Sequence, residues 1–236
     1  VGFGGYPTIP TLLAAAFLKF KTVIHEQNAV LGRANRLLAP RATRIASSFK
    51  TTAFLRDADL TRTVWTGNPV RPEIRDIRDL PFPAFGADQP IRVLVTGGSQ
   101  GATIFASVVP AALAALPDNM RQRVQVTQQC RPEDIDSVRA AYAAHGINAT
   151  LESFFDDLPQ RVGAAHLVIC RAGASTTAEL TSAGRPAILV PYPHAIDDHQ
   201  TANAARLCDS GGAWMIPDSD FTPDVLTARL VSLFSV

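Results

Sequence analysis

Two glycine-rich segments have the composition of phosphate-binding loops. One is Gly97-Gly98-Ser99-Gln100-Gly101, between a strand expected over residues 91–96 and an alanine-rich helix that begins at about Thr103. The other is Gly2-Phe3-Gly4-Gly5-Tyr6, which leads into a helix. Glycine lets the backbone approach a phosphate closely, and a helix N-terminus adds free N–H groups and a positive dipole end. The first loop is neither a G-x-G-x-x-G nor a Walker motif, and a tight turn without a ligand is the alternative for both.

A third segment, residues 171–179, places Gly173 and several small residues at a helix N-terminus. Glu179 lies one turn further along, on the face of Ser175 and Thr176. A carboxylate in that place can accept two hydrogen bonds from a ribose diol. The alternative is a helix start rich in capping residues, with an exposed glutamate.

Two polar clusters follow apolar runs. Residues 194–200 come after a buried strand, where polar side chains can bind sugar hydroxyls. The histidines and aspartates of this cluster match no usual zinc spacing, so no metal is expected. The other cluster is His25-Glu26-Gln27-Asn28. Its histidine and glutamate can do acid–base chemistry, or they simply hydrogen-bond a loop.

Short apolar strands alternate with helices along the chain, which predicts an α/β fold with parallel sheets covered on both faces. The clearest strands are residues 91–96, 124–127, 167–170 and 186–191, and helices are expected over residues 8–19, 103–116, 132–145, 175–183 and 199–211. Residues 72–90 hold four prolines and many charges, which is typical of a linker. Ligands bind beyond the carboxyl ends of such strands, where these motifs lie.

Composition and charge exclude several classes of protein. Of the 236 residues, 47% are hydrophobic and 18% charged, and the net charge is +1, so neither a disordered chain nor a general nucleic-acid binder is indicated. Residues 1–56 nevertheless hold eight bases and one acid, which indicates either a surface that meets anions or a solvated helix face. Three distant cysteines fit a reducing compartment. The longest apolar stretch, Ile9–Leu18, is too short to span a bilayer.

Seven segments together form a specific combination: GFGGYP (2–7), VIHEQNAVLGRANRLLA (23–39), TGNPVR (66–71), VLVTGGSQGA (93–102), SFFDDLP (153–159), CRAGASTTAEL (170–180) and PAILVPYPHAIDDHQTANA (186–204). In this order they resemble the MurG family, over essentially the whole chain. That family attaches N-acetylglucosamine to a lipid-linked muramyl-pentapeptide and so turns lipid I into lipid II.

The resemblance implies a GT-B fold, in which two Rossmann-like domains with parallel sheets face each other across a cleft. Residues 1–71 would be the C-terminal part of the acceptor domain on the membrane side, residues 72–90 a linker, and residues 91–236 the domain that binds the UDP-sugar donor. Both domains are expected to be incomplete, because the chain starts at Val1 without a methionine and stops inside an apolar run. The family's first glycine-rich loop, with its proposed basic histidine, would precede Val1, which leaves the catalytic residue unknown.

The family pattern implies ten substrate-binding residues: Asn28, Arg71, Ser99, Phe155, Ala174, Ser175, Thr176, Glu179, His199 and Gln200. By this resemblance Arg71 and Ser99 contact the diphosphate, and the backbone of Phe155 holds the uracil. Residues 174–176 line the nucleotide pocket and Glu179 binds the ribose, while residues 199–200 bind the sugar opposite Asn28. An acceptor-side loop comprises five residues: Gly4, Gly5, Tyr6, His25 and Glu26. One departure is Gln128-Gln129-Cys130, where many members have His-Gln-Thr-Gly.

The implied reaction is an inverting displacement that releases UDP, without metal or cofactor, because Arg71 and a helix N-terminus can stabilise the leaving charge. The implied partners are UDP-N-acetylglucosamine, undecaprenyl-linked lipid I and an anionic membrane surface, with no nucleic acid. The implied location is peripheral, on the cytoplasmic side of the bacterial inner membrane. Two alternatives stay open: another GT-B transferase such as a diacylglycerol glucosyltransferase, or a nucleotide-binding fragment without catalysis.

The expected membrane-facing surface combines apolar residues with bases. An apolar cluster at the end of the first helix is flanked by lysines, and further bases follow: Leu12, Leu13, Phe17, Leu18, Phe20, Lys19, Lys21, Arg36, Arg41, Arg44 and Lys50. Leu12, Leu13 and Phe17 are expected to belong to the core instead. The bases are the firmer part of the prediction, because a buried unpaired base is costly.

Overall fold

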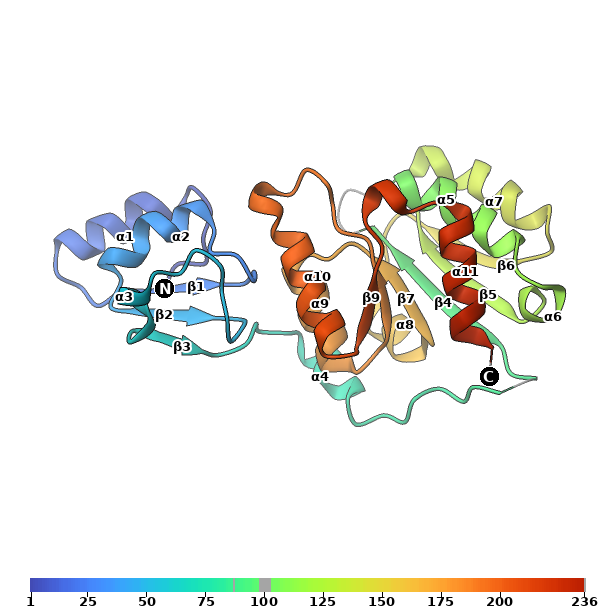
Figure 1. Cartoon of the computed structure of the whole chain (residues 1–236), viewed down its shortest axis with the longest axis horizontal. Helices are drawn as coiled ribbons and strands as arrows, with labels where there is room; N and C mark the ends of the chain where they lie inside the picture. The colour runs from blue at the N-terminus through green and yellow to red at the C-terminus, as the bar shows by residue number, and fades with distance from the viewer. Residues whose placement is uncertain (87, 98–102, 236) are drawn as a thin grey trace.

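The computed structural model describes residues 1–86, 88–97 and 103–235, which form two units on separate parallel sheets (Figure 1). The first sheet contains β1 (Val23–Glu26), β2 (Arg44–Ser47) and β3 (Thr63–Trp65) in sequence order. The second has the order β6-β5-β4-β7-β8-β9, with β4 (Ile91–Thr96), β5 (Val124–Gln129), β6 (Asn148–Glu152), β7 (Leu167–Cys170), β8 (Ala187–Leu189) and β9 (Ala213–Met215). The predicted α/β fold with parallel sheets is confirmed.

The first unit packs its helices α1 (Thr8–Phe17) and α2 (Arg33–Leu38) over its sheet, followed by η1 (Ala39–Arg41) and α3 (Asp57–Leu60). Its core is formed by Leu12, Ile24, Leu38 and Ile45 with their neighbours. Gly2 extends the sheet beside Ile24, and a Cβ there would lie 2.2 Å from a methyl of Thr8 and 2.5 Å from one of Leu12, so these side chains would have to shift.

Helix α3 of this unit contains a buried carboxylate. Asp59 is 0% exposed and accepts hydrogen bonds from Arg56 and Arg62. The hydrogen bonds from Arg56 hold the pKa of Asp59 below its ordinary value. The polar stretch around residue 57 is therefore a structural ion-pair cluster within the first unit.

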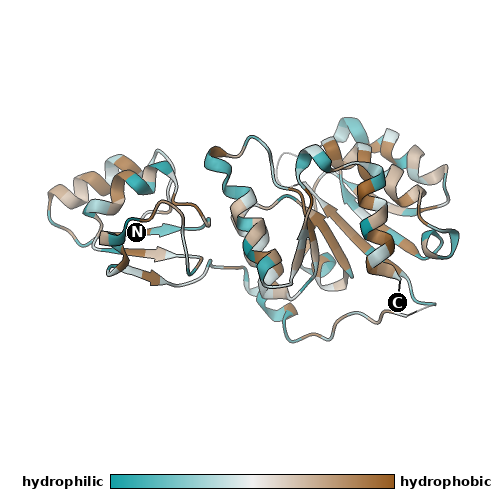
Figure 2. Cartoon of the chain, in the orientation of Figure 1, coloured by the Kyte–Doolittle hydropathy of each residue, from teal (hydrophilic) through white to brown (hydrophobic). Residues whose placement is uncertain are grey.

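The second unit has three layers, because successive side chains of a strand point to opposite faces. Val93 and Val95 of β4 pack beneath α5 (Thr103–Ala114), α7 (Ile135–Ala143) and α11 (Pro223–Phe234). Leu94 joins the opposite core, with α8 (Leu158–Ala164), α9 (Ala174–Ala183) and α10 (His199–Asp209). The central strands are accordingly hydrophobic between more polar helices (Figure 2). Short elements complete the unit: α6 (Asp118–Arg121), η2 (Pro132–Asp134), η3 (Ile196–Asp198) and η4 (Asp218–Asp220).

The proline-rich residues 72–90 differ from the irregular linker expected from the sequence. They begin with a helix, α4 (Pro72–Ile77), in which Ile74 and Ile77 are buried in the core beside α8 and α9. Six residues are too few to show a helical period, and proline at the first helical position is compatible with a helix. The domain limits at residues 71 and 91 remain a prediction.

The end of α1 also differs from expectation. Leu12 is buried and Leu13 partly buried, but Phe17 is 80% exposed, so the expectation of a core position for Phe17 was wrong. The helix stops at Phe17 and Lys19 adopts a left-handed conformation with φ of 60°. This reversal leaves Phe17, Leu18 and Phe20 on the surface next to Lys19.

Candidate functional site

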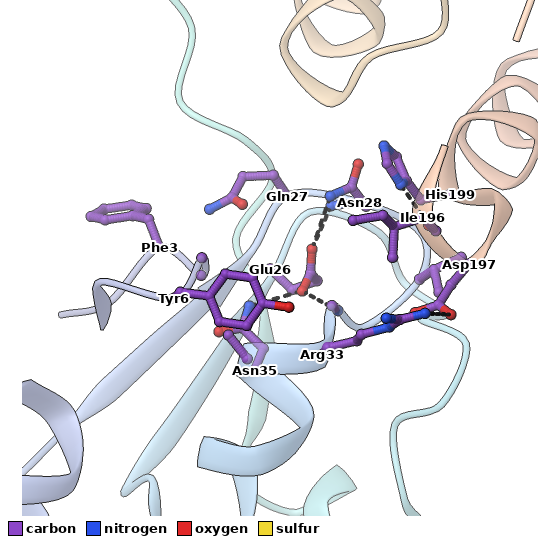
Figure 3. A pocket seen from close by; sticks show the side chains of 15 residues that line it. Phe3, Tyr6, Glu26, Gln27, Asn28, Arg33, Asn35, Ile196, Asp197 and His199 are labelled. Carbon is purple, nitrogen blue, oxygen red and sulfur yellow. Dashed lines mark hydrogen bonds and ion pairs between the residues drawn. The ribbon is translucent and has the colours of Figure 1, made fainter. Parts of the chain in front are cut away.

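A pocket of about 210 Å³, open to solvent, lies where the two units meet (Figure 3). One side is built by the glycine-rich turn before α1 and by the loop from β1 to α2. The other side is η3 and the first residue of α10. The pocket brings together six residues expected from the sequence: Gly4, Gly5, Tyr6, Glu26, Asn28 and His199.

Glu26 organises the first side of the pocket. Its side chain ends β1 and is only 2% exposed. The carboxylate accepts hydrogen bonds from the backbone N–H groups of Asn28 (3.0 Å) and Gly32 (2.8 Å) and from the side-chain amides of Asn28 (3.2 Å) and Asn35 (2.8 Å). Every partner is an N–H donor, which suits an ionised carboxylate. Glu26 thus holds the loop from residue 27 to residue 35 in one conformation.

His25 has a similar structural environment. Its Nε2 donates to the carbonyl of Gly67 at 3.0 Å, and its Nδ1 accepts from the amide of Gln27 at 3.1 Å. The ring is 6% exposed and lies 5.5 Å from the ring of Phe3. Of the two sequence alternatives for His25 and Glu26, this geometry favours hydrogen bonding of a loop over acid–base chemistry.

Asn203 of α10 links the two units at the edge of this loop. Its side chain is 0% exposed and accepts from the backbone N–H of Ala29 at 2.8 Å. Its amide nitrogen donates to the side-chain oxygen of Asn28 at 3.0 Å and to the carbonyl of Ala172, after β7, at 3.1 Å. Asn28 therefore lies between Glu26 of its own unit and Asn203 of the other.

An ion pair crosses the junction beside the pocket. Arg36 Nη2 is 2.6 Å from a carboxylate oxygen of Asp197, and Arg33 Nη2 is 3.6 Å from the other. Arg36 also donates to the carbonyl of Leu31. Arg36 was expected among the bases of a membrane-facing surface, but its partner in the second unit makes it part of the junction between the units.

The strand order of the second sheet reverses between β4 and β7. Ligands in parallel sheets bind at such a reversal, beyond the carboxyl ends of the strands. Gly97 follows β4 there, while Ser99 lies outside the described residues. After β7, Gly173 precedes α9, which begins with Ala174, Ser175 and Thr176.

Arg71 and Glu179 contact each other, although the family resemblance implied that one binds the diphosphate and the other the ribose. Arg71 Nε and Nη2 donate to one carboxylate oxygen of Glu179 at 3.0 and 2.8 Å. The arginine side chain is 51% exposed and the glutamate 17%. Both groups therefore lie at the surface between α4 and α9, where a ligand can reach them.

Gln200 and Phe155 have largely structural contacts on this side. The side-chain oxygen of Gln200 accepts from the backbone N–H groups of Ala172 (3.2 Å) and Tyr192 (2.9 Å), so it ties together the loops after β7 and β8. The ring of Phe155 is buried, with the guanidinium of Arg161 4.3 Å from its centre. Among the described residues, no three His, Cys, Asp or Glu gather as metal ligands, and no helix is long and apolar enough to cross a bilayer.

Sequence reasoning missed Asn203 and Asp197 as residues that join the units. The position of Asn203 in its helix could have indicated its burial, because it shares one face of α10 with the buried Ala204 and Leu207. A polar residue on an apolar helix face needs a buried hydrogen-bond partner. The identity of that partner, 174 residues away in Ala29, was not contained in any local pattern.

Two units with parallel sheets that meet around a shared pocket have the architecture of the GT-B fold. The profile of the glycosyltransferase family 28 C-terminal domain matches residues 92–235, and that of the family 28 N-terminal domain matches residues 1–47. The chain belongs to glycosyltransferase family 28.

Individual relatives agree with this family. The UDP-N-acetylglucosamine–N-acetylmuramyl-(pentapeptide) pyrophosphoryl-undecaprenol N-acetylglucosamine transferase of Paramagnetospirillum magneticum is 57% identical, over 100% of this chain and 63% of that protein. The transferase of the same description from Rhodospirillum centenum is 54% identical, over 100% of this chain and 62% of its own length. The crystal structure of Acinetobacter baumannii MurG superposes with a TM-score of 0.80 at 36% identity, covering 99% of this chain and 64% of that one. The chain thus spans less than two thirds of these proteins.

Proposed function

We propose that the protein to which this chain belongs transfers N-acetylglucosamine from UDP-N-acetylglucosamine to undecaprenyl-linked lipid I, which yields lipid II for peptidoglycan. The observation that carries the proposal is the meeting of the Glu26–Asn28 loop with the start of α10 around one pocket. Such a pocket can hold an acceptor and a donor sugar face to face. The names of the two relatives state this donor and this acceptor.

The proposed donor site runs from α9 to α10. Glu179 binds the ribose hydroxyls, and Arg71, released from Glu179, pairs with the diphosphate together with Ser99. The backbone of Phe155 holds the uracil and residues 174–176 line the nucleotide pocket. His199 and Gln200 bind the sugar hydroxyls on one side and Asn28 on the other. Gly4, Gly5 and Tyr6 form the acceptor side, where His25 and Glu26 hold the loop.

In the proposed step, an acceptor hydroxyl oxygen attacks the anomeric carbon while the bond from that carbon to the phosphate oxygen breaks. UDP leaves with the electron pair, the hydroxyl proton passes to a base, and the configuration inverts. The developing negative charge needs nearby positive groups in a site with little water. Arg71 supplies a full charge, and the N-terminus of α9 supplies N–H groups and a dipole end.

Transfer of labelled sugar by the full-length protein tests the proposal. We expect lipid I to be glycosylated and diacylglycerol not to be. Glycosylation of diacylglycerol instead would support the other GT-B activity. Calorimetry on this chain gives a second test, in which uridine diphosphate should bind more tightly than guanosine diphosphate. Equal affinity for the two nucleotides contradicts the assigned donor site.

We infer that the first unit meets the cytoplasmic surface of an anionic membrane, as a lipid-linked acceptor requires. Phe17, Leu18 and Phe20 are 80%, 70% and 66% exposed, and Lys19 and Lys21 lie between and beside them. Each base near such a surface adds about 1 kcal/mol of attraction that salt screens. Binding to vesicles rich in anionic lipid should weaken with salt and with Lys19→Glu plus Lys21→Glu. Binding that ignores both changes, or no binding by the full-length protein, contradicts the inference.

A further inference from the structure

We propose that Asn203 is a positioning residue for the donor sugar, which it serves by holding the side chain of Asn28. The inference rests on the proposed function, because Asn28 is assigned to the sugar there. Asn203 itself is 0% exposed, so it does not touch a ligand. It acts on sugar binding through the groups to which it is hydrogen-bonded on the two sides of the junction.

The orientation of the Asn203 amide follows from its backbone partners. Its oxygen accepts from the N–H of Ala29 at 2.8 Å, and its nitrogen donates to the carbonyl of Ala172 at 3.1 Å. A reversed amide would place donor against donor and acceptor against acceptor. The remaining N–H of Asn203 is therefore available to the side-chain oxygen of Asn28, 3.0 Å away.

Asn28 is consequently oriented from both ends. Its amide nitrogen donates to Glu26 at 3.2 Å and its oxygen accepts from Asn203. An asparagine amide has two N–H donors and two lone pairs, so one donor and one lone pair remain for a sugar hydroxyl. A connected network in a dry interior rigidifies the groups that it includes.

The same residue sets the distance between Asn28 and the other proposed sugar ligands. Gln200 and His199 precede Asn203 by three and four positions on α10, so they lie on its side of the helix one turn earlier. Its bond to Ala172 also holds the turn that enters α9. One buried amide thus places both sides of the sugar site relative to each other.

Asn203→Asp is the informative substitution, because it keeps the size of the side chain and the bond from Ala29. The second carboxylate oxygen would face the oxygens of Asn28 and Ala172, so both lose their donor. We expect affinity for UDP-N-acetylglucosamine to fall about tenfold, the equivalent of losing one to two hydrogen bonds. Affinity for uridine diphosphate, which lacks the sugar, should fall less than about threefold.

Two further comparisons separate positioning from a general structural role. With Asn28→Ala already present, Asn203→Asp should cause a smaller further loss of the preference for the sugar nucleotide than it causes alone, because the Asn28 side chain is gone and only the bond to Ala172 remains to be lost. Lowering the pH should restore part of that preference in Asn203→Asp alone, since a protonated carboxyl can again donate. Arg206→Ala is the matched control on the same helix, at a half-exposed side chain outside the site, and should leave both affinities unchanged.

Calorimetry on the full chain measures the affinity for both nucleotides, after circular dichroism has shown that each variant is folded. If Asn203→Asp does not fold, Asn203→Ser keeps one donor and takes its place, with the same expected loss of preference. Equal losses for the two nucleotides, or losses that add to those of Asn28→Ala, overturn the positioning role. If the unmodified chain binds neither nucleotide, the proposed function fails and this inference fails with it.

Discussion

The two glutamates that face the junction have opposite environments. Glu26 is 2% exposed and its carboxylate accepts four N–H donors, whereas Glu179 shares one oxygen with the half-exposed Arg71. Removing one partner from a buried network leaves unsatisfied groups, while exposed ion pairs contribute only about 0–1 kcal/mol. The proposed acceptor side is therefore held in place before any ligand arrives, and the proposed donor side can exchange its internal ion pair for a ligand.

The largest effect is expected from Glu26→Ala. Four N–H groups lose their acceptor, and each buried donor left unsatisfied costs about 1–3 kcal/mol, so unfolding free energy should fall by at least about 3 kcal/mol. Urea denaturation measures the loss. Glu73→Ala, at an exposed glutamate of α4, is the control and should change little. A loss below about 1 kcal/mol for Glu26→Ala would mean that the loop does not depend on its carboxylate.

Glu179→Ala should act on binding rather than on folding. We expect the affinity for uridine diphosphate to weaken by about 1–3 kcal/mol, the range for hydrogen bonds to a charged group. Stability should change by less than about 1 kcal/mol, because only an exposed ion pair is lost. Calorimetry and denaturation on the same variant separate the two quantities. Unchanged affinity would remove Glu179 from the donor site.

Arg71→Lys tests the other half of that pair. A guanidinium binds two phosphate oxygens at once, whereas an ammonium offers a single point of charge. We expect donor affinity to fall by about 1–2 kcal/mol with the charge retained, again without a loss of stability. Arg75→Lys, on the exposed face of α4, is the matched control. Donor affinity equal to that of the unmodified chain would count against a diphosphate contact.

His166 is a buried polar group of the second unit, and it makes stability depend on pH. Its Nδ1 accepts from the backbone N–H of Arg92 at 2.9 Å, so Nε2 carries the proton that is donated to Ala84. Burial, with the nearby charges of Arg92, Arg185 and Arg123, lowers the pKa of His166.

The unfolded chain therefore binds a proton at this histidine before the folded chain does. Stability should fall as the pH drops below about 6.5, by about 1.4 kcal/mol for each unit by which the pKa is lowered. His166→Gln should remove this slope, and the exposed His145→Gln should retain it. Thermal denaturation between pH 8 and about pH 5 measures both. Equal slopes in the two variants would exclude His166 as the source.

The smallest effect is expected from Arg36→Ala. Its bond to Asp197 is short but partly exposed, so the loss should be about 0.2–1 kcal/mol and should shrink with salt. A double-mutant cycle with Asp197→Asn isolates the pair from the contact of Arg36 with the ring of Phe54. A coupling free energy well above about 1 kcal/mol would show that the junction is held as firmly as the Glu26 loop.

Local sequence patterns were sufficient to predict the strands and helices whose hydrophobic residues form a clear run or period. The strand expected over residues 91–96 and that over residues 167–170 match β4 and β7 in full, because β-branched and apolar runs of this length are buried in parallel sheets. The helix expected over residues 8–19 ends slightly earlier, at Phe17. Short elements were missed: β6, β9, α4 and α8 are each seven residues or fewer, too few to establish a period.

The sequence by itself determined the fold class, the order of the motifs and the residue types available at the junction. Only the tertiary structure decided how those residues are paired. The residues around Glu26 in the sequence do not show that its carboxylate accepts from four N–H groups. Arg71 contacts Glu179, which lies 108 positions further along the chain. A hydrogen bond depends on the separation and direction of two groups in space. Where those groups come from different units, their separation is set by the packing of whole elements, which no local pattern of residues records.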